Sequence, residues 1–281
     1  MSENPEIGKT VKVNNHGVNY HEQGEGETVI LIHGSGPGVT GYANWRLLMP
    51  ELAKNFHVIA LDVVGFGYTE HPENFEYTLD GWVNFMVGFM DTLDIKKAHL
   101  VGNSFGGALS LALASKYPEK VGRFVLMGAG GIRFEMSDGL RKVWKYQPSF
   151  SAMNELMDVF THESFQVSDE IVELRYQASI RPGYQEAYQS LFPEPIQEQY
   201  NNLCLPEEDI KSIMNPVLIV HGREDRIVPF SCGIRAHELL KHSDLHLFGE
   251  CGHWTMFEKA DEFADLVEKF LLKKNDTGDI V

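Results

Sequence analysis

One short stretch of the chain could activate a serine, Ser104, as a nucleophile. It reads Gly102-Asn103-Ser104-Phe105-Gly106. An apolar run, residues 98–101, precedes it, and a run of small and apolar residues, 107–114, follows it. This order predicts a strand, a sharp turn and a helix, the setting in which G-x-S-x-G exposes a serine hydroxyl above a sheet. The pattern alone is weak, because a glycine-rich turn with an inert serine reads the same way. Partners for Ser104 decide between the two.

A nucleophilic serine needs a base, and the base needs an acid that orients it. After a G-x-S-x-G turn the chain order is serine, then Asp or Glu, then His. Asp225 follows the apolar run 217–220, and His253 follows the run 245–248. Both are therefore expected in loops that leave the carboxyl ends of strands. We predict the triad Ser104, Asp225 and His253.

Two of these assignments have competitors. Glu224 is adjacent to Asp225 and is the alternative acid, although pairing with a neighbouring arginine is its simpler interpretation. The chain has 12 histidines. His33 and His221 end predicted strands, so we expect them to pack or to tether loops. His253 is distinguished by its late position and the glycine before it.

A second glycine-rich loop, residues 33–38 (His-Gly-Ser-Gly-Pro-Gly), follows the first core strand. Such a loop can turn a backbone N–H toward the serine. We predict that the N–H groups of Ser35 and Phe105 form an oxyanion hole. A dinucleotide site is disfavoured, because the spacing is G-x-G-x-G with an intervening proline and not G-x-G-x-x-G.

The surrounding elements predict a doubly wound α/β sheet. A hairpin is expected first, from residues 10–14 and 18–22, and short apolar runs with helical patterns between them follow. The expected core strands are 29–33, 58–62, 99–102, 124–128, 217–221 and 245–248. The expected core helices are 45–53, 79–93, 105–116, 234–240 and 262–272. Residues 134–205 contain no strand pattern and are predicted to form a helical lid, with helices near 140–146, 152–160, 169–178 and 184–191. Residues 1–133 and 206–281 then form the α/β core.

Composition limits the partners. The formal charge of −16 (24 basic and 40 acidic residues) argues against nucleic acid or an anionic membrane. No apolar run reaches the ~20 residues that span a bilayer, and the polar start of the chain is unlike a secretory signal. The three cysteines lack C-x-x-C spacing, so reduced thiols in a cytoplasmic protein are expected. An anionic substrate would need local cations, since the net charge repels it.

Five segments carry a family resemblance. They are residues 33–38 followed by Asn44-Trp45-Arg46, residues 102–107, 179–183, 221–225, and Gly252-His253-Trp254. Together they resemble the meta-cleavage product hydrolases of the α/β-hydrolase superfamily, over about residues 7–272. The most similar branch acts on ring-fission products of monocyclic aromatics.

The resemblance implies hydrolysis of the C5–C6 bond of a 2-hydroxy-6-oxo-hexa-2,4-dienoate through its keto tautomer. The products would be 2-hydroxypenta-2,4-dienoate and a carboxylic acid. No metal or organic cofactor is implied, and a homo-oligomer is expected. Ser104 would attack the C6 carbonyl with His253 as base.

The resemblance also implies substrate-binding residues. Arg181, Asn44 and Asn103 would hold the polar end of the dienoate, and Trp254 would pack beside it. Each has a structural alternative: a helix N-cap for Asn44, a bond to the backbone of the turn for Asn103, a surface charge for Arg181 and core packing for Trp254. From their place after the predicted strand 124–128, Gly130 and Gly131 are expected to leave room for a small branched or modest acyl group.

Two other functions stay open. An esterase or lactonase of the same fold would share the triad but would not need Arg181. A non-catalytic ligand-binding relative would keep the fold with an inert Ser104. Dehalogenases and epoxide hydrolases of this fold are disfavoured, because their nucleophile at this position is typically Asp.

Overall fold

The computed structural model describes residues 4–72 and 74–273 of the chain. The described residues form one eight-stranded sheet in the order β1-β2-β4-β3-β5-β6-β7-β8. The strands are β1 Lys9–Val13, β2 His16–Gln23, β3 Thr28–Ile32, β4 His57–Leu61, β5 Ala98–Asn103, β6 Val121–Met127, β7 Val217–Gly222 and β8 Ser243–Phe248. β1 and β2 pair antiparallel as the predicted hairpin, and β3 to β8 run parallel. The predicted α/β-hydrolase fold with a mostly parallel sheet is therefore confirmed.

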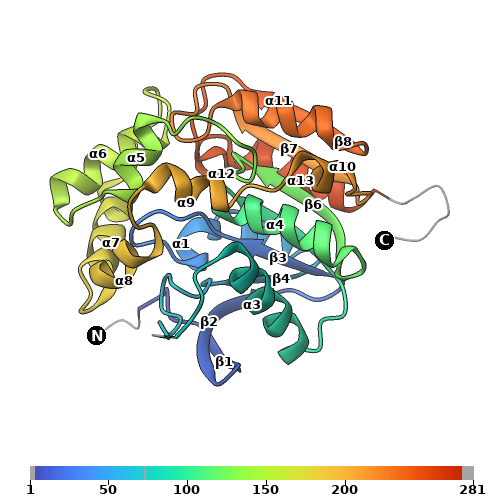
Figure 1. The fold of residues 1–281 in the computed structure, drawn as a ribbon, viewed down its shortest axis with the longest axis horizontal. Coiled ribbons are helices and arrows are strands. Elements are labelled where there is room, and N and C mark those ends of the chain that lie inside the picture. Colours follow the sequence, from blue (N-terminus) through green and yellow to red (C-terminus); the bar gives the residue numbers. More distant parts are fainter. Residues whose placement is uncertain (1–3, 73, 274–281) are drawn as a thin grey trace.

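Helices cover both faces of this sheet (Figure 1). Helices α3 (Leu79–Thr92) and α4 (Phe105–Lys116) pack together on one face, and α2 (Leu48–Leu52) and α13 (Ala260–Leu271) pack together on the other. The remaining core helices are α1 Gly41–Trp45, α10 Glu207–Lys211, α11 Phe230–Leu239 and α12 Thr255–Glu258, with a 3-10 turn at Pro118–Lys120. No helix of the described residues is long and apolar enough to cross a membrane.

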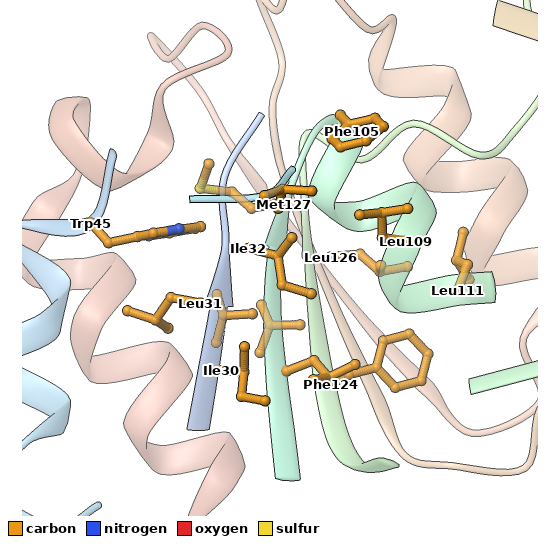
Figure 2. Close-up of a cluster of buried hydrophobic side chains, with 14 of the residues drawn as sticks. Ile30, Leu31, Ile32, Trp45, Phe105, Leu109, Leu111, Phe124, Leu126 and Met127 are labelled. Atoms are coloured by element: carbon orange, nitrogen blue, oxygen red, sulfur yellow. The ribbon is translucent and has the colours of Figure 1, made fainter. Parts of the chain in front are cut away.

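The core lies between these layers. Figure 2 shows Ile30, Leu31 and Ile32 of β3 and, across the intervening β5, Phe124, Leu126 and Met127 of β6, with Leu109 of α4 on one side and Trp45 of α1 on the other. Strands β5 and β6 are buried along their whole length. Burial on both faces explains why these strands read as continuous apolar runs without alternation.

The predicted helix 45–53 is in fact two short helices, α1 and α2, and this prediction was wrong. The interruption has a cause in the sequence. Pro50 has no N–H to donate to the carbonyl four residues earlier, so it is tolerated only in the first turn of a helix. A new helix, α2, therefore begins at Leu48, and Thr40 caps α1 by accepting from the Ala43 N–H at 3.0 Å.

Between β6 and β7 lie α5 Asp138–Trp144, α6 Phe150–Phe160, α7 Asp169–Ser179, α8 Tyr184–Leu191 and α9 Ile196–Asn202. Figure 1 shows α5 to α8 gathered at one side of the sheet. We call residues 134–205 the lid segment; these limits and the matching core ranges stay a prediction. Those core ranges include residues 1–3, 73 and 274–281, which lie outside the described residues. The short helices α9, α10 and α12 were not predicted.

The turn from β5 into α4 holds Ser104 in a strained backbone conformation. Its φ is 53° and its ψ is −111°, a region that non-glycine residues rarely occupy. The turn is clamped on both sides: the Ser104 N–H donates to the Met127 carbonyl at 3.0 Å, and the Ser104 carbonyl accepts from Gly130 at 2.9 Å. Close approach of the helix to β3 is the reason for a glycine at 106, because a Cβ there would lie 2.2 Å from the Ile32 carbonyl oxygen.

This clamp predicts that Gly106→Ala destabilises the fold. A methyl group would push α4 away from β3, at a cost of about 1–3 kcal/mol in the free energy of unfolding. Urea denaturation measures the change. The matched control is Gly130→Ala, since a Cβ there meets its nearest neighbour, the Ser104 carbonyl oxygen, only at 3.4 Å. Equal losses in the two variants would contradict this account of the turn.

Candidate active site

A small cavity lies over the turn that carries Ser104. Its volume is about 10 Å³, which is room for about one water molecule. Its polar wall contains Ser35, Asn44, Asn103, Ser104, Arg175 and His253. Its apolar wall contains Leu140, Val143, Phe160, Ile227 and Trp254. The cavity thus joins residues of the sheet, of the loop after β3 and of the lid segment.

Asp225 and His253 are brought together by the loops after β7 and β8. His253 Nδ1 lies 2.7 Å from Asp225 Oδ2, and Asp225 Oδ1 accepts from the N–H groups of Ile227 and Val228 at 2.8 and 2.9 Å. Burial alone would raise the pKa of Asp225, but the imidazoles of His253 and His221 outweigh it and hold the pKa well below its usual value. Asp225 is therefore an ionised, fixed partner for His253.

Neither of the competing residues, Glu224 and His221, lines the cavity. The Glu224 carboxylate accepts from Arg223 Nε at 2.7 Å and from the Cys251 N–H at 3.2 Å, on a partly exposed surface. His221 is buried, and its Nε2 lies 2.9 Å from the Val228 carbonyl oxygen and 3.2 Å from Asp225 Oδ2. His221 therefore packs under the Asp225 loop, in line with the expectation of a loop-tethering role.

The loop after β3 passes directly over Ser104. A Cβ on Gly34 would lie 3.4 Å from Ser104 Cβ and 3.0 Å from Asn103 Oδ1. Ser35 and Ser104 therefore border the same cavity. Phe105 is the first residue of α4, so its N–H has no partner within the helix.

The two asparagines differ in their partners. Asn103 Nδ2 donates to the Met127 carbonyl at 3.3 Å, so its side chain does contribute to holding the turn. Asn44 is not the N-cap of α1, because Thr40 takes that position. Asn44 Nδ2 is buried and makes no hydrogen bond within the described residues. An unsatisfied buried donor at a cavity wall is costly unless a ligand supplies the acceptor.

The structure places Arg181 outside the cavity wall, away from the polar end where it was predicted to bind substrate. Its Nη2 donates to the Gly67 carbonyl at 2.5 Å, its Nε donates to the Ala178 carbonyl at 2.9 Å, and its guanidinium stacks 3.8 Å over the Tyr68 ring. These contacts fasten the end of α7 to the loop after β4. The guanidinium is therefore committed to this attachment.

A different arginine of α7, Arg175, lines the cavity. It is 3% exposed, donates to the Pro37 carbonyl at 3.2 Å and lies 5.0 Å from the Trp254 ring centre. Burial lowers its pKa to about 10, so it still carries its charge at neutral pH. The sequence held a signal for it: Val172, Arg175 and Ala178 share the buried face of α7 at helical spacing.

Trp254 lines the cavity, and its ring stacks on Phe160 of α6 at 4.6 Å and 11°. The Phe160 carbonyl accepts from the N–H groups of both His253 and Trp254, at 2.7 and 3.2 Å. The His253 loop is therefore tied to the lid segment.

In the described ranges, no three His, Cys, Asp or Glu side chains are placed to hold a metal ion.

The two arginines predict opposite effects on stability. Burial of the Arg175 charge costs desolvation free energy. Arg175→Met should therefore leave the free energy of unfolding unchanged or raise it by about 1–3 kcal/mol. Arg181→Met loses two hydrogen bonds and a stacking contact, so it should lower that energy by about 1–2 kcal/mol. Thermal and urea unfolding of the pair measures both. A large loss for Arg175→Met with none for Arg181→Met would contradict this assignment.

Comparison with known proteins agrees with this architecture. The alpha/beta hydrolase fold family model matches residues 27–260. The 2-hydroxy-6-oxo-2,4-heptadienoate hydrolase of Pseudomonas putida F1 is 48% identical over 95% of this chain and 97% of its own length. The 2-hydroxymuconate semialdehyde hydrolase of Pseudomonas sp. CF600 is also 48% identical, over 95% of this chain and 94% of its own.

Solved structures extend the match to the backbone. A meta-cleavage product hydrolase from Pseudomonas fluorescens IP01 superposes with a TM-score of 0.93 at 52% identity, over 95% of this chain and 98% of that one. A 2-hydroxy-6-oxo-6-phenylhexa-2,4-dienoate hydrolase from Rhodococcus sp. RHA1 gives 0.87 at 31% identity, over 93% and 97%. The chain therefore belongs to the α/β-hydrolase fold family and, within it, to the meta-cleavage product hydrolases.

Proposed function

We propose that this protein hydrolyses the C5–C6 bond of a 2-hydroxy-6-oxohexa-2,4-dienoate formed by ring fission of an aromatic compound. Ser104 is the nucleophile, His253 the base and Asp225 the residue that orients the base. The observation that carries the proposal is one cavity that holds Ser104, His253 and a buried guanidinium, Arg175. The names of the relatives supply the substrate class.

The chemistry requires both ends of the substrate to be held. A carbon–carbon bond has no leaving group until the dienol becomes its keto tautomer, in which the electrons released at C5 can flow into an enol. Ketonisation moves the proton of the C2 hydroxyl to C5. Attack at C6 then transfers the acyl group, the electron pair of the C5–C6 bond flows to the C2 oxygen, which takes a proton, and water supplies the hydroxyl of the carboxylic acid. The other product is 2-hydroxypenta-2,4-dienoate. The N–H groups of Ser35 and Phe105 stabilise the oxyanion at C6.

Arg175 replaces Arg181 as the anchor for the substrate carboxylate. No carboxylate oxygen lies within ion-pair distance of Arg175 among the described residues, so its charge is available to a ligand. A guanidinium fork matches a carboxylate in two parallel hydrogen bonds. Asn44 and Asn103 complete this polar end, and Trp254 packs beside the diene. The buried charge of Arg175 in the cavity wall also offsets the repulsion that a net charge of −16 exerts on an anionic substrate.

The acyl end faces Leu140 and Val143 of α5 and Ile227 of the loop after β7. These side chains are apolar and branched, so they leave less room for an aromatic acyl group than for a small one. The heptadienoate and semialdehyde substrates that name the two relatives at 48% identity carry such small groups. Gly130 and Gly131 stay a prediction for this pocket.

We also propose a cytoplasmic homo-oligomer. Cys204, Cys232 and Cys251 are buried free thiols, which suits a reducing compartment. Burial raises the pKa of Cys204 to about 11 and of the other two to about 12, so they are unreactive.

The proposed oligomer is supported by exposed apolar side chains at the β8 end of the sheet. Phe230 and Ile234 of α11 and Leu247 of β8 could form an apolar contact with a second copy of the chain.

The triad predicts that kcat depends strongly on Asp225 and little on its neighbour Glu224. In Asp225→Asn the acceptor for Ile227 and Val228 is kept, but an amide N–H faces His253 Nδ1 and disfavours the required tautomer. We expect kcat to fall about 10⁴-fold, as in other serine triads. Glu224→Gln is the control and should keep kcat within about threefold. A variant pair with the opposite ranking would assign the acid to Glu224.

The carboxylate anchor is tested by Arg175→Gln with Arg181→Gln as its matched control. Arg175→Gln should lower kcat/KM for a dienoate about 100-fold or more, since it removes one partner of a buried charge pair. Hydrolysis of an uncharged p-nitrophenyl ester should change only a few-fold. Arg181→Gln should spare both activities in the folded protein. If Arg175→Gln spared both activities as well, Arg175 would not be the anchor of the substrate carboxylate.

A further inference from the structure

Side chains of the lid segment hold the loop that contains Ser35. Trp144 Nε1 of α5 donates to Ser35 Oγ at 3.0 Å, and the Tyr188 hydroxyl of α8 lies 3.0 Å from the Ser35 carbonyl oxygen. Two further contacts hold the end of the same loop. Arg175 donates to the Pro37 carbonyl at 3.2 Å, and the Gly38 N–H donates to the Tyr184 oxygen at 2.9 Å.

We propose that Trp144 and Tyr188 are positioning residues that build the oxyanion hole from the lid side. The inference rests on the proposed function, in which the Ser35 N–H stabilises the oxyanion. In addition, the oxyanion hole is complete only when the lid segment packs on the loop after β3. Neither side chain would act on the substrate through these bonds.

The geometry of Ser35 supports this role. The carbonyl of Gly34, in the same peptide group as the Ser35 N–H, lies 2.6 Å from His33 Nδ1. His33 Nε2 in turn accepts from the Val63 N–H at 3.0 Å, so this side of the peptide is fixed by the core. The side chain and carbonyl of Ser35 are fixed by Trp144 and Tyr188. The N–H thus lies between a core anchor and a lid anchor.

The two lid residues are themselves held rigidly. The Trp144 ring stacks on Phe192 at 4.0 Å and 2°, and Trp144 is 5% exposed. Tyr188 is 1% exposed, and its hydroxyl also lies 2.9 Å from the carbonyl oxygen of Val143, the residue before Trp144. The contacts therefore join α5, α8 and the Ser35 loop into one packed unit.

The small size of the cavity links substrate entry to the contacts that hold Ser35. A cavity with room for about one water molecule cannot hold a six-carbon dienoate, so its wall, to which α5, α6 and α7 contribute, has to open for substrate to enter. An opening that displaces α5 or α8 breaks the contacts of Trp144 and Tyr188 and releases the loop that contains Ser35. Seating the lid over substrate restores the bonds and completes the hole. Charge stabilisation is thereby confined to the closed, water-poor state.

A double-mutant cycle tests the proposal. Trp144→Phe keeps a ring against Phe192 but removes the N–H donor, and Ser35→Ala removes the acceptor while keeping the backbone N–H. Each should lower kcat about tenfold, part of the 10²–10³ that a lost oxyanion donor costs. KM should change less than about threefold. The double variant should be no slower than either single one, because both remove the same bond.

Tyr188→Phe should behave like Trp144→Phe, and Tyr146→Phe is the matched control. Tyr146 is another buried lid residue, but its hydroxyl bonds Ser179 Oγ at 3.1 Å, within the lid segment. A boronic acid that forms a tetrahedral adduct on Ser104 supplies a second readout. Its affinity should fall with kcat in Trp144→Phe and Tyr188→Phe and should be unchanged in Tyr146→Phe.

Three outcomes would overturn the proposal: additive losses in the cycle, a rise in KM at constant kcat, or an equal loss of kcat in Tyr146→Phe. Each variant is measured with the dienoate and with a p-nitrophenyl ester, since both reactions pass through an oxyanion. If the wild-type protein hydrolysed only the ester, the proposed substrate would fail. The same cycle on the ester would still decide the role of Trp144 and Tyr188.

Discussion

The strained backbone at Ser104 is the constraint on which the site depends. A positive φ at a residue with a side chain costs about 1–3 kcal/mol and persists only where its surroundings enforce it. Here β6 and the loop after it hold the two sides of the turn, through Met127 and Gly130, and β3 leaves no room for the helix to shift. The continuous apolar strands are therefore more than a core. They supply the rigidity that keeps one hydroxyl in an unfavourable position.

Around this turn, two buried charges are treated in opposite ways. Asp225 receives two backbone N–H groups and two imidazoles, so its charge is stabilised within the protein. Arg175 donates one hydrogen bond to a carbonyl and lies against the faces of aromatic rings. Burial lowers its pKa. A charge that the protein satisfies orients a neighbour, whereas a charge that it leaves incompletely satisfied is prepared for a ligand. The acidic surface makes this arrangement more important, since the field of the whole molecule opposes an anionic substrate.

The parts of the site that belong to the sheet could be predicted, because short-range patterns determine them. Apolar runs locate β3, β5, β7 and β8, and the residues that leave their carboxyl ends meet at one edge. Asp225 and His253 follow from this rule, and the structure places them 2.7 Å apart. The break before Pro50 could also be predicted, because a proline is tolerated only in the first turn of a helix.

The lid segment could be predicted only as helices. Arg175 and Arg181 both belong to the α7 region, and motif similarity favoured the arginine before Pro182. Which of them enters the cavity depends on how α7 packs over the Pro37 loop, a long-range contact that no local pattern encodes. The contacts of Trp144 and Tyr188 with Ser35 are of the same kind, since they join positions more than a hundred residues apart.

The most direct test of the central claim compares the wild-type protein with Ser104→Ala on 2-hydroxy-6-oxohepta-2,4-dienoate. The decay of the yellow dienolate absorbance is followed, and the products are identified by NMR. The account predicts that the wild-type protein bleaches the dienolate and releases 2-hydroxypenta-2,4-dienoate and acetate in equal amounts. Ser104→Ala should bind the dienoate and leave its C5–C6 bond intact. Cleavage by Ser104→Ala at the wild-type rate, or an intact bond after incubation with the wild-type protein, would contradict the account.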